Sequence, residues 1–303
     1  MGSCRSLTLE TAAMPESFVF GHTSFNKDNE PYFLVQCDGE IMYVDLLGKR
    51  FSLEFDLSKK YCTGWFDFEN RISQPCPENL EVDDKYDACI ACQKRTGFNP
   101  AFYNATSVSP QQEKINQQPH YVYLAYFGPK VIKVGISQKD RGLRRLLEQG
   151  ARLVMVLETF SSAVIARSYE ERISRQCKVR EQIGRKQKLS LLRLEFNHQQ
   201  GLSELHSTLE RIEKSLDMKF ENVKLIETQD FYTHNDANLS SAITPLESDK
   251  LAGTVVAMVG SFCITSHQGQ NWIYDLKSFT GYRATQLHEP ILLEQPVEQM
   301  SFF

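Results

Sequence analysis

The chain has 303 residues, 41% of them hydrophobic, and its 34 Lys and Arg against 38 Asp and Glu give a formal net charge of −4. This composition is ordinary for a soluble globular protein with about two or three compact units. We expect neither a membrane-spanning nor a secreted protein, because no apolar run approaches the roughly 20 residues that span a bilayer and the start lacks an apolar signal stretch. Eight cysteines in such a chain predict a cytoplasmic protein whose thiols stay reduced or bind metal.

Residues 1–60 are assigned to an N-terminal β unit. From residue 17 onward, apolar and polar side chains alternate around a turn at Asp38-Gly39, which predicts a hairpin or small meander. The preceding start, MGSCRS, matches the short pattern for myristoylation at Gly2, with Cys4 as a candidate palmitoylation site. The alternative is a disordered start without lipid.

Residues 61–118 are predicted to form a cysteine-rich, zinc-ribbon-like module followed by a linker. Cys62, Cys76, Cys89 and Cys92 are separated by 13, 12 and 2 residues, and the last pair has the spacing of one half of a zinc site. Four thiolates can close a tetrahedral shell around Zn²⁺, which would stabilise a segment with little apolar content. The alternative is a group of reduced cysteines without metal. Residues 106–119 are polar and Gln-rich, which favours a linker.

Residues 119–197 are predicted to form a basic domain. The patterns predict strands over 121–127, 131–137 and 152–159, and helices over 140–149, from Ser161 or Ser162 to about 177, and around 187–195. Residues 129–193 carry 16 Lys and Arg against 6 Asp and Glu, a balance of +10 that leaves −14 on the rest of the chain. The contrast favours a site for a polyanion such as DNA or RNA, and the alternative is a solvated helix face.

The first two strands of this domain are expected to carry site residues on one surface. Side chains alternate between the two faces of a strand, so a hairpin brings Tyr123, Lys133 and Gly135 onto the same side. At Gly135 a phosphate or another backbone could approach closely.

The helix that follows supplies arginines and the next one a carboxylate. Arg141 and Arg145 are four residues apart and can point the same way, with Arg144 beside them, and guanidinium groups suit phosphate oxygens. We therefore assign Arg141, Arg144 and Gly135 to nucleic-acid binding. In the next helix Glu170 lies on the apolar stripe, whereas Glu171 points away. A carboxylate on that stripe needs a partner, either an Arg in a structural ion pair or a divalent cation.

The last third of the chain is predicted to be an amphipathic helix followed by a β domain. Residues 198–219 form the helix, with apolar residues at alternating spacings of three and four: Leu202, Leu205, Leu209, Ile212 and Leu216. This seam allows self-association through 202–216, and the alternative is packing against the helix's own domain. Residues 220–303 return to a β pattern, which predicts a small barrel or sandwich that could pack with the N-terminal unit.

The residues of the basic domain, in this order, resemble the GIY-YIG endonuclease superfamily. Val122-Tyr123-Leu124 looks like the GIY strand and Lys133-Val134-Gly135 like the YIG strand. Arg145 matches the helical arginine, and Glu170 matches the metal-binding glutamate. The segment KVGIS…RLLEQGA and the C-terminal FCITSHQGQNWIYDLKSFTGYRA also look similar to an uncharacterised branch that joins this core to a cysteine-rich module. The resemblance covers residues 61–197 best.

The resemblance implies a small three-stranded sheet with flanking helices and hydrolysis of a phosphodiester. In that mechanism a tyrosine activates water, while an arginine and one Mg²⁺ or Mn²⁺ stabilise the developing charge. The implied catalytic set here is Tyr123, Arg145 and Lys133, with Glu170 as the divalent-metal ligand. Lys133 stands where the family has its second tyrosine. A lysine can contact phosphate, or act as a base when burial lowers its pKa.

The expected fold class is therefore α+β, with a GIY-YIG-like core, a cysteine-rich module and N- and C-terminal β units. The first functional hypothesis is a nucleic-acid-binding protein with a divergent GIY-YIG-like core, for which the resemblance implies cleavage of DNA or RNA with Mg²⁺ or Mn²⁺. The second is a non-catalytic, zinc-containing DNA- or RNA-binding module, in which binding depends steeply on salt. The third is a protein-interaction scaffold whose basic face is only solvated.

Overall fold

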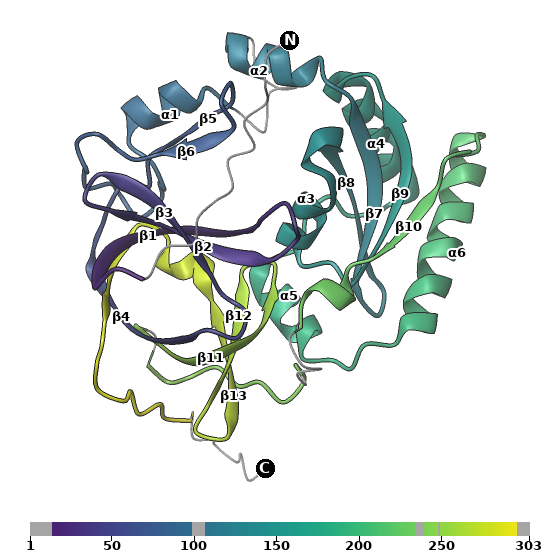
Figure 1. Ribbon diagram of the computed structural model, residues 1–303. Helices are drawn as coiled ribbons and strands as arrows, with labels where there is room; N and C mark the ends of the chain where they lie inside the picture. Colours follow the sequence, from purple (N-terminus) through teal and green to yellow (C-terminus); the bar gives the residue numbers. More distant parts are fainter. Residues whose placement is uncertain (1–13, 99–106, 234–238, 248, 296–303) are drawn as a thin grey trace.

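The computed structural model describes residues 14–98, 107–233, 239–247 and 249–295 (Figure 1). Over these ranges the chain forms three sheets and six α-helices, so the expected α+β class is confirmed. The candidate lipidation residues Gly2 and Cys4 lie outside the described residues. Among the helices of the described ranges, none combines the length and apolar character that crossing a bilayer requires.

The largest sheet has eight strands taken from both ends of the chain, in the order β13-β12-β11-β4-β14-β1-β2-β3. It curls around its own core in the lower left of Figure 1. The strands are β1 (Ser17–Phe25), β2 (Pro31–Cys37), β3 (Glu40–Asp45), β4 (Arg50–Lys60), β11 (Lys250–Val259), β12 (Phe262–His267), β13 (Gln270–Asp275) and β14 (Tyr282–Gln286). Their inward side chains, including Phe20, Phe55 and Ile273, form the largest apolar core.

The N-terminal and C-terminal β segments thus form one sheet. Strand β4 pairs with β11 along one edge and with β14 along the other, and β14 also pairs with β1. The alternating pattern of each segment predicts its strands but contains no information about their partners, since any strand with one apolar face can pair with another. Strands within residues 17–60 and 250–286, which the sequence assigned to two separate units, therefore form one hydrogen-bonded sheet.

The cysteine-rich segment forms a small module at one end of this sheet (upper left of Figure 1). It consists of a hairpin, β5 (Trp65–Asp67) with β6 (Ile72–Gln74), and helix α1 (Ile90–Thr96). The expected linker over 106–119 contains a further helix, α2 (Pro110–Asn116). Ser109 caps it by accepting a hydrogen bond from the Gln112 backbone N–H, and Pro110 occupies its first turn, a pairing typical of helix starts.

The basic domain contains a four-stranded sheet in the order β10-β9-β7-β8. Its strands are β7 (His120–Gly128), β8 (Val131–Gln138), β9 (Leu153–Phe160) and β10 (Lys224–Glu227). The first three follow the predicted pattern. The fourth, β10, adds to the edge of β9 from a segment about 65 residues further along the chain, so the sheet has one strand more than the predicted three.

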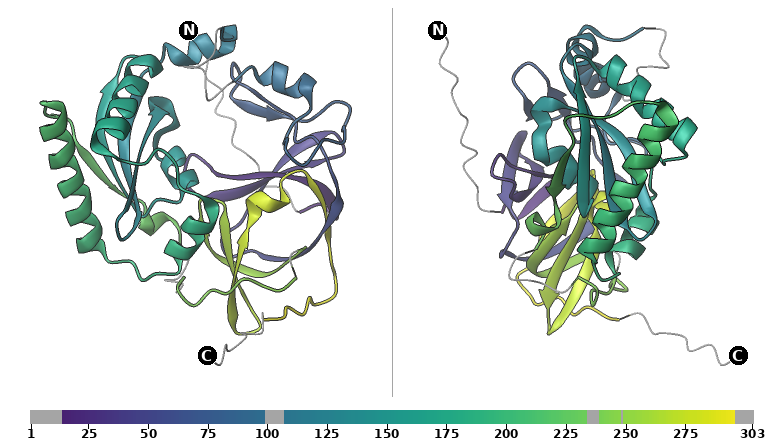
Figure 2. Two further views of the ribbon diagram at one scale, coloured as in Figure 1. Left: turned by 180° about the vertical axis from the view of Figure 1, so that it is seen from behind. Right: turned by 90° about the vertical axis from the view of Figure 1, so that its right-hand side faces the viewer.

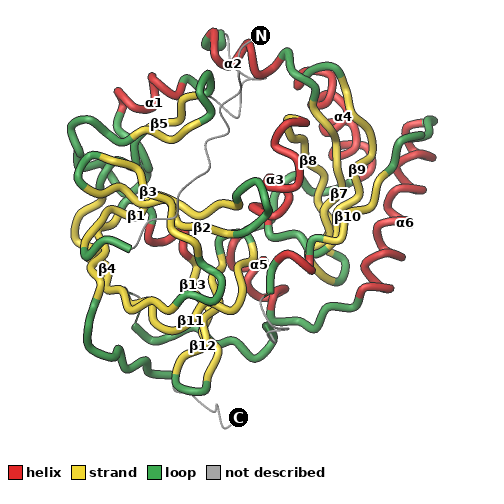
Figure 3. Tube along the Cα trace, viewed as in Figure 1, coloured by secondary structure: helices red, strands yellow, loops and turns green. Residues whose placement is uncertain are grey.

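Helices cover both faces of the four-stranded sheet. On one face lie α4 (Ala163–Cys177) and α6 (His198–Leu216), packed against Val122, Leu124 and Tyr126. On the other lie α3 (Gly142–Gln149) and α5 (Arg185–Leu192), with Tyr121, Tyr123 and Ala125 of the sheet. Figures 2 and 3 show α6 along the outer side of the molecule and α3 and α5 toward the eight-stranded sheet.

In helices α3 and α6, the structure shows which core each apolar side chain joins. In α3, neighbouring Leu146 and Leu147 belong to different cores, that of the four-stranded sheet and that of the eight-stranded sheet. This helix therefore joins the two halves of the molecule. In α6, Leu205, Ile212 and Leu216 are buried against the chain's own sheet, with Leu202 and Leu209 partly buried. The heptad-like seam is thus used within the chain, the alternative to self-association.

Candidate functional site

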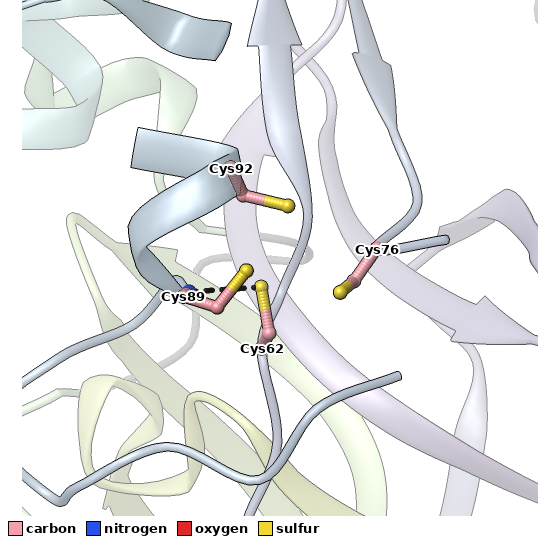
Figure 4. Close-up of side chains that lie close together, drawn as sticks. All are labelled: Cys62, Cys76, Cys89 and Cys92. Carbon is pink, nitrogen blue, oxygen red and sulfur yellow. Dashed lines mark hydrogen bonds between the residues drawn. The ribbon is translucent and has the colours of Figure 1, made fainter. Parts of the chain in front are cut away.

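Four sulfur atoms meet in the cysteine-rich module (Figure 4). The Sγ atoms of Cys62, Cys76, Cys89 and Cys92 all lie within 4.8 Å of one another, and three of the four side chains are buried. The predicted cluster is therefore present, and its geometry could hold a metal ion such as zinc. In the described part of the chain, these four cysteines are the one group of three or more His, Cys, Asp or Glu side chains whose ligand atoms lie close enough together to hold a metal ion.

Local backbone geometry brings the four cysteines together. Gly64 has a φ of +85°, and a Cβ on it would lie 2.0 Å from the Gln74 carbonyl oxygen, so only glycine fits this turn between Cys62 and the hairpin. The hairpin then returns the chain to Cys76. Cys89 occupies the N-cap of α1, which places Cys92 on the same side of the first turn.

The surroundings of the sulfurs fit a bound cation. The backbone N–H of Cys89 donates to the Cys62 Sγ at 3.1 Å, and the Cys76 N–H donates to the Gln36 side chain of β2 at 3.1 Å. Burial raises the pKa of Cys62 to about 11 and raises that of Cys92 as well. Thiolates at such a spacing repel one another in a buried site, and a divalent cation removes that cost by binding all four.

The second candidate site lies on the face of the four-stranded sheet that α3 covers. Tyr123 of β7 is paired with Gly135 of β8, and Lys133 stands on the same face beside them. The Lys133 Nζ lies 6.0 Å from the centre of the Tyr123 ring and donates to the Gln149 Oε1 at 3.0 Å. The predicted shared surface of Tyr123, Lys133 and Gly135 is confirmed.

Burial sets the chemistry of these two side chains. Tyr123 is 1% exposed and Lys133 is 9% exposed. Burial raises the pKa of Tyr123 far above its ordinary value, and the charge of Arg145 opposes part of that rise. Burial and then the charge of Arg145 lower the pKa of Lys133 to about 8. At neutral pH the site therefore presents a neutral phenol and a cationic amine.

Gly135 has a different role from the predicted one. A Cβ at this position would lie 2.6 Å from both the Cζ and the hydroxyl oxygen of Tyr123. The glycine thus leaves room for the tyrosine ring across the strand pair, rather than for a phosphate.

A Gly135→Ala substitution tests this role. We expect the ring of Tyr123 to be displaced and the free energy of unfolding to fall by about 1–3 kcal/mol, the usual cost of overpacking. Urea unfolding measures the change. Gly184→Ala is the matched control, because a Cβ at Gly184 would meet no atom within 4 Å. Equal stability of the Gly135→Ala variant and the wild type would contradict the assignment.

The arginines of the α3 segment are organised around Glu148. Its carboxylate pairs closely with Arg141, lies 3.6 Å from Arg145, and accepts a hydrogen bond from the Ser24 hydroxyl of β1 at 2.7 Å. Burial alone would raise the pKa of Glu148, but Arg141, Ser24 and Arg145 outweigh it and leave that pKa below its ordinary value. Glu148 therefore orients Arg141 and Arg145 and offsets part of their charge.

The three predicted arginines do not share one environment. Arg145 acts electrostatically on Tyr123 and Lys133. Arg144 acts instead on Tyr32 of β2, in the eight-stranded sheet. Successive residues of a helix point about 100° apart, so Arg144 and Arg145 cannot both face the tyrosine. Arg145 and, with a smaller effect, Arg141 thus act on Tyr123.

Glu170 is 7% exposed and has an arginine as its direct partner. Arg167 pairs closely with Glu170 and lies 2.9 Å from Glu181, which follows the helix. Burial raises the pKa of Glu170, against the effect of Arg167. The partner of Glu170 is therefore an arginine in an ion pair, one of the two alternatives that the sequence left open. With a guanidinium already on the carboxylate, the residues as arranged do not fit Mg²⁺ or Mn²⁺. The predicted outward direction of Glu171 is confirmed by its exposed ion pair with Arg175 at 2.7 Å.

Lys188 and Gln149, which were not predicted as site residues, complete this site. The Lys188 Nζ of α5 donates to the Gln149 backbone oxygen at 2.7 Å, on the same residue whose side chain accepts from Lys133. Burial, followed by the charges of Lys133 and Arg145, lowers the pKa of Lys188 to about 8. Sequence offered no signal for this convergence, because Lys188 lies 55 residues beyond Lys133 on a separate helix. Helical spacing could have indicated the Arg145–Glu148 pair.

The comparisons with known proteins give one result. A family model described as "Protein of unknown function (DUF2797)" matches residues 76–284, more than half of the chain. The match takes in three of the four clustered cysteines and the whole four-stranded sheet. Neither the curated proteins nor the solved structures yield a match.

Proposed function

The chain belongs to the DUF2797 family, and we propose that it binds the sugar-phosphate backbone of DNA or RNA beside α3, with a zinc ion stabilising its cysteine-rich module. The supporting observation is the meeting of Lys133, Lys188 and Arg145 around Gln149, next to Tyr123. Three cations gathered in one region have a potential that attracts phosphate. The +10 balance of residues 129–193 extends that potential over the domain.

The resemblance to GIY-YIG endonucleases is part of this proposal. It is supported by the common surface of Tyr123, Lys133 and Gly135 and by the position of Arg145 near them. Binding without cleavage is favoured by two features. The phenol of Tyr123 has a raised pKa and is a poor base, and Glu170 is engaged by Arg167 rather than open to a divalent cation.

The test compares two neighbouring arginines. We expect Arg145→Gln to weaken binding of labelled DNA or RNA and to lower the slope of log affinity against log salt by about 0.7–0.9, the loss of one phosphate contact. Arg144→Gln removes the same charge from the same helix on the side of Tyr32 and should change the slope less. Fluorescence anisotropy over a salt series measures both.

Three outcomes distinguish a phosphate site at Arg145 from an effect of net charge alone and from a protein-interaction scaffold. Equal effects of the two arginine substitutions would show that only net charge matters, against a site at Arg145. Absence of binding by the wild type to single-stranded, duplex and branched substrates would favour a protein-interaction scaffold. A salt-dependent affinity that falls with Arg145→Gln supports the proposed site.

A second candidate function is cleavage dependent on Mg²⁺ or Mn²⁺. It is supported by the electrostatic proximity of Arg145 and Glu170 to the Tyr123 hydroxyl. It requires Glu170 to exchange Arg167 for the metal. Incubation of the pure protein with branched and single-stranded DNA in Mg²⁺ or Mn²⁺ tests it. Product that persists in Glu170→Ala would exclude Glu170 from metal binding, and no product at all would leave binding as the function.

A further inference from the structure

A small pocket lies where the two large sheets meet. It has a volume of about 50 Å³ and is lined by the end of α3, by α5 and by the turn between β11 and β12. At this junction Gly150 and Gly260 touch: a Cβ on Gly260 would lie 3.1 Å from the Gly150 nitrogen. On this measure one water molecule needs about 10–15 Å³, so the pocket has room for a small anion.

Two cations line the pocket without an acidic partner: Arg152, which is buried, and Lys188, which is partly buried. Arg152 is 3% exposed, and its two terminal nitrogens donate to the carbonyls of Leu192 and Leu194 at 2.7 and 2.8 Å. Its Nε is buried and has no hydrogen-bond partner within the ranges that the structure describes. Lys188 donates to the Gln149 carbonyl and lies over the Phe127 ring at 4.9 Å.

The acidic groups nearby are already engaged. Glu148, which also lines the pocket, pairs with Arg141 and accepts from Ser24. Asp275 pairs with Arg185 at 3.1 Å. No carboxylate lies within ion-pair distance of Arg152 or Lys188 in the described chain. Buried charges without an opposite charge are costly, so the pocket has the electrostatic character of an anion site.

We propose that this pocket binds a phosphate dianion, as inorganic phosphate or as the terminal phosphate of a phosphomonoester, beside the two cations that line it, Lys188 and Arg152. The bound anion would contact α5 of the basic domain and the β11–β12 turn of the eight-stranded sheet, and so stabilise their junction. This site shares Lys188 and Gln149 with the proposed nucleic-acid site, but its test uses inorganic phosphate and does not depend on nucleic-acid binding.

Calorimetric titration with sodium phosphate, at an ionic strength held constant with NaCl, tests the proposal. We expect a Kd of about 0.1–1 mM for the full chain and at least about tenfold weaker binding by Lys188→Met. Lys188→Arg keeps the charge and should retain binding. Lys186→Met is the matched control, because Lys186 is exposed on the same helix and does not line the pocket.

The outcomes distinguish the source of the phosphate. A preference for a 5′-phosphorylated oligonucleotide over its 5′-hydroxyl form, lost in Lys188→Met, identifies a terminal phosphate as the ligand. Binding of inorganic phosphate without that preference identifies the free anion. Absence of phosphate binding by the wild type, or equal affinities of the wild type and Lys188→Met, overturns the proposal. Thermal melting with and without phosphate checks that each variant is folded.

Discussion

Replacing Cys62 by serine should abolish the proposed zinc binding and unfold the cysteine-rich module. The fully buried apolar members of that module are Cys62, Cys76 and Cys92, with Trp65 and Val82 only partly buried around them. The core is therefore made of the proposed zinc ligands themselves. In isolated zinc fingers the bound ion contributes about 10–16 kcal/mol at neutral pH, so its loss exceeds what so few apolar contacts can offset.

The zinc content of the protein and the resistance of the cysteine-rich module to proteolysis measure this effect. We expect one zinc per chain in the wild type by elemental analysis, much less in Cys62→Ser, and rapid proteolysis within residues 61–98 of the variant. Cys37→Ser is the matched control, because its half-buried thiol lies outside the cluster and donates to the Ser17 carbonyl at 3.3 Å. Full zinc content in Cys62→Ser, or a wild type whose module resists proteolysis equally with and without a chelator, would contradict the zinc assignment.

Binding of nucleic acid should weaken as pH rises through about 8, because Lys133 loses its charge there. Burial is the main cause of the lowered pKa, and Arg145 adds to it. Where one protonated amine is required for binding, affinity falls by up to about tenfold for each pH unit above that pKa. We expect Lys133→Arg, whose guanidinium stays charged, to bind with little change between pH 7 and about 9.5.

Deprotonation of Lys133 has opposite effects on binding and on stability. It lowers the affinity for nucleic acid but raises the free energy of unfolding. The folded-state pKa of Lys133, about 8, is below its ordinary value of 10.5, so between these values the unfolded chain holds the proton more tightly. The cost of burying the charged amine is present below pH 8 and disappears as pH rises, and this contribution to stability therefore increases with pH. Loss of affinity above pH 8 cannot then be attributed to Lys133-linked unfolding.

The control for the pH experiment is a Lys188→Arg variant, because Lys188 is the other lysine that contacts Gln149. Burial lowers the pKa of Lys188 to about 8 as well. Lys188→Arg should leave the pH dependence of nucleic-acid binding in place if Lys133 is the contact. A pH dependence that survives Lys133→Arg and disappears in Lys188→Arg would move the phosphate contact to Lys188. Anisotropy titrations between pH 7 and about 9.5 at constant ionic strength supply the data.

Much of the local structure follows from local sequence. Alternation along 121–127 and 131–137 places Tyr123 and Lys133 on one face, because successive side chains of a strand point to opposite sides whatever surrounds it. Helical periodicity likewise turns Glu170 inward and Glu171 outward. The cysteine spacing predicted the cluster, since a turn, a hairpin and one helical turn suffice to bring the sulfurs together.

Partners from distant parts of the chain were decided only by the tertiary structure. Apolar alternation in 17–60 and 250–286 predicts strands, but hydrogen-bonded ladders accept any strand of matching pattern, so the joining of both segments through β4 is a property of the assembled sheet. The same holds for Glu181 on Arg167 and for Lys188 on Gln149, whereas the Arg167–Glu170 pair has a local helical spacing. Side-chain direction is local and periodic, whereas the partner of a side chain depends on which elements pack together.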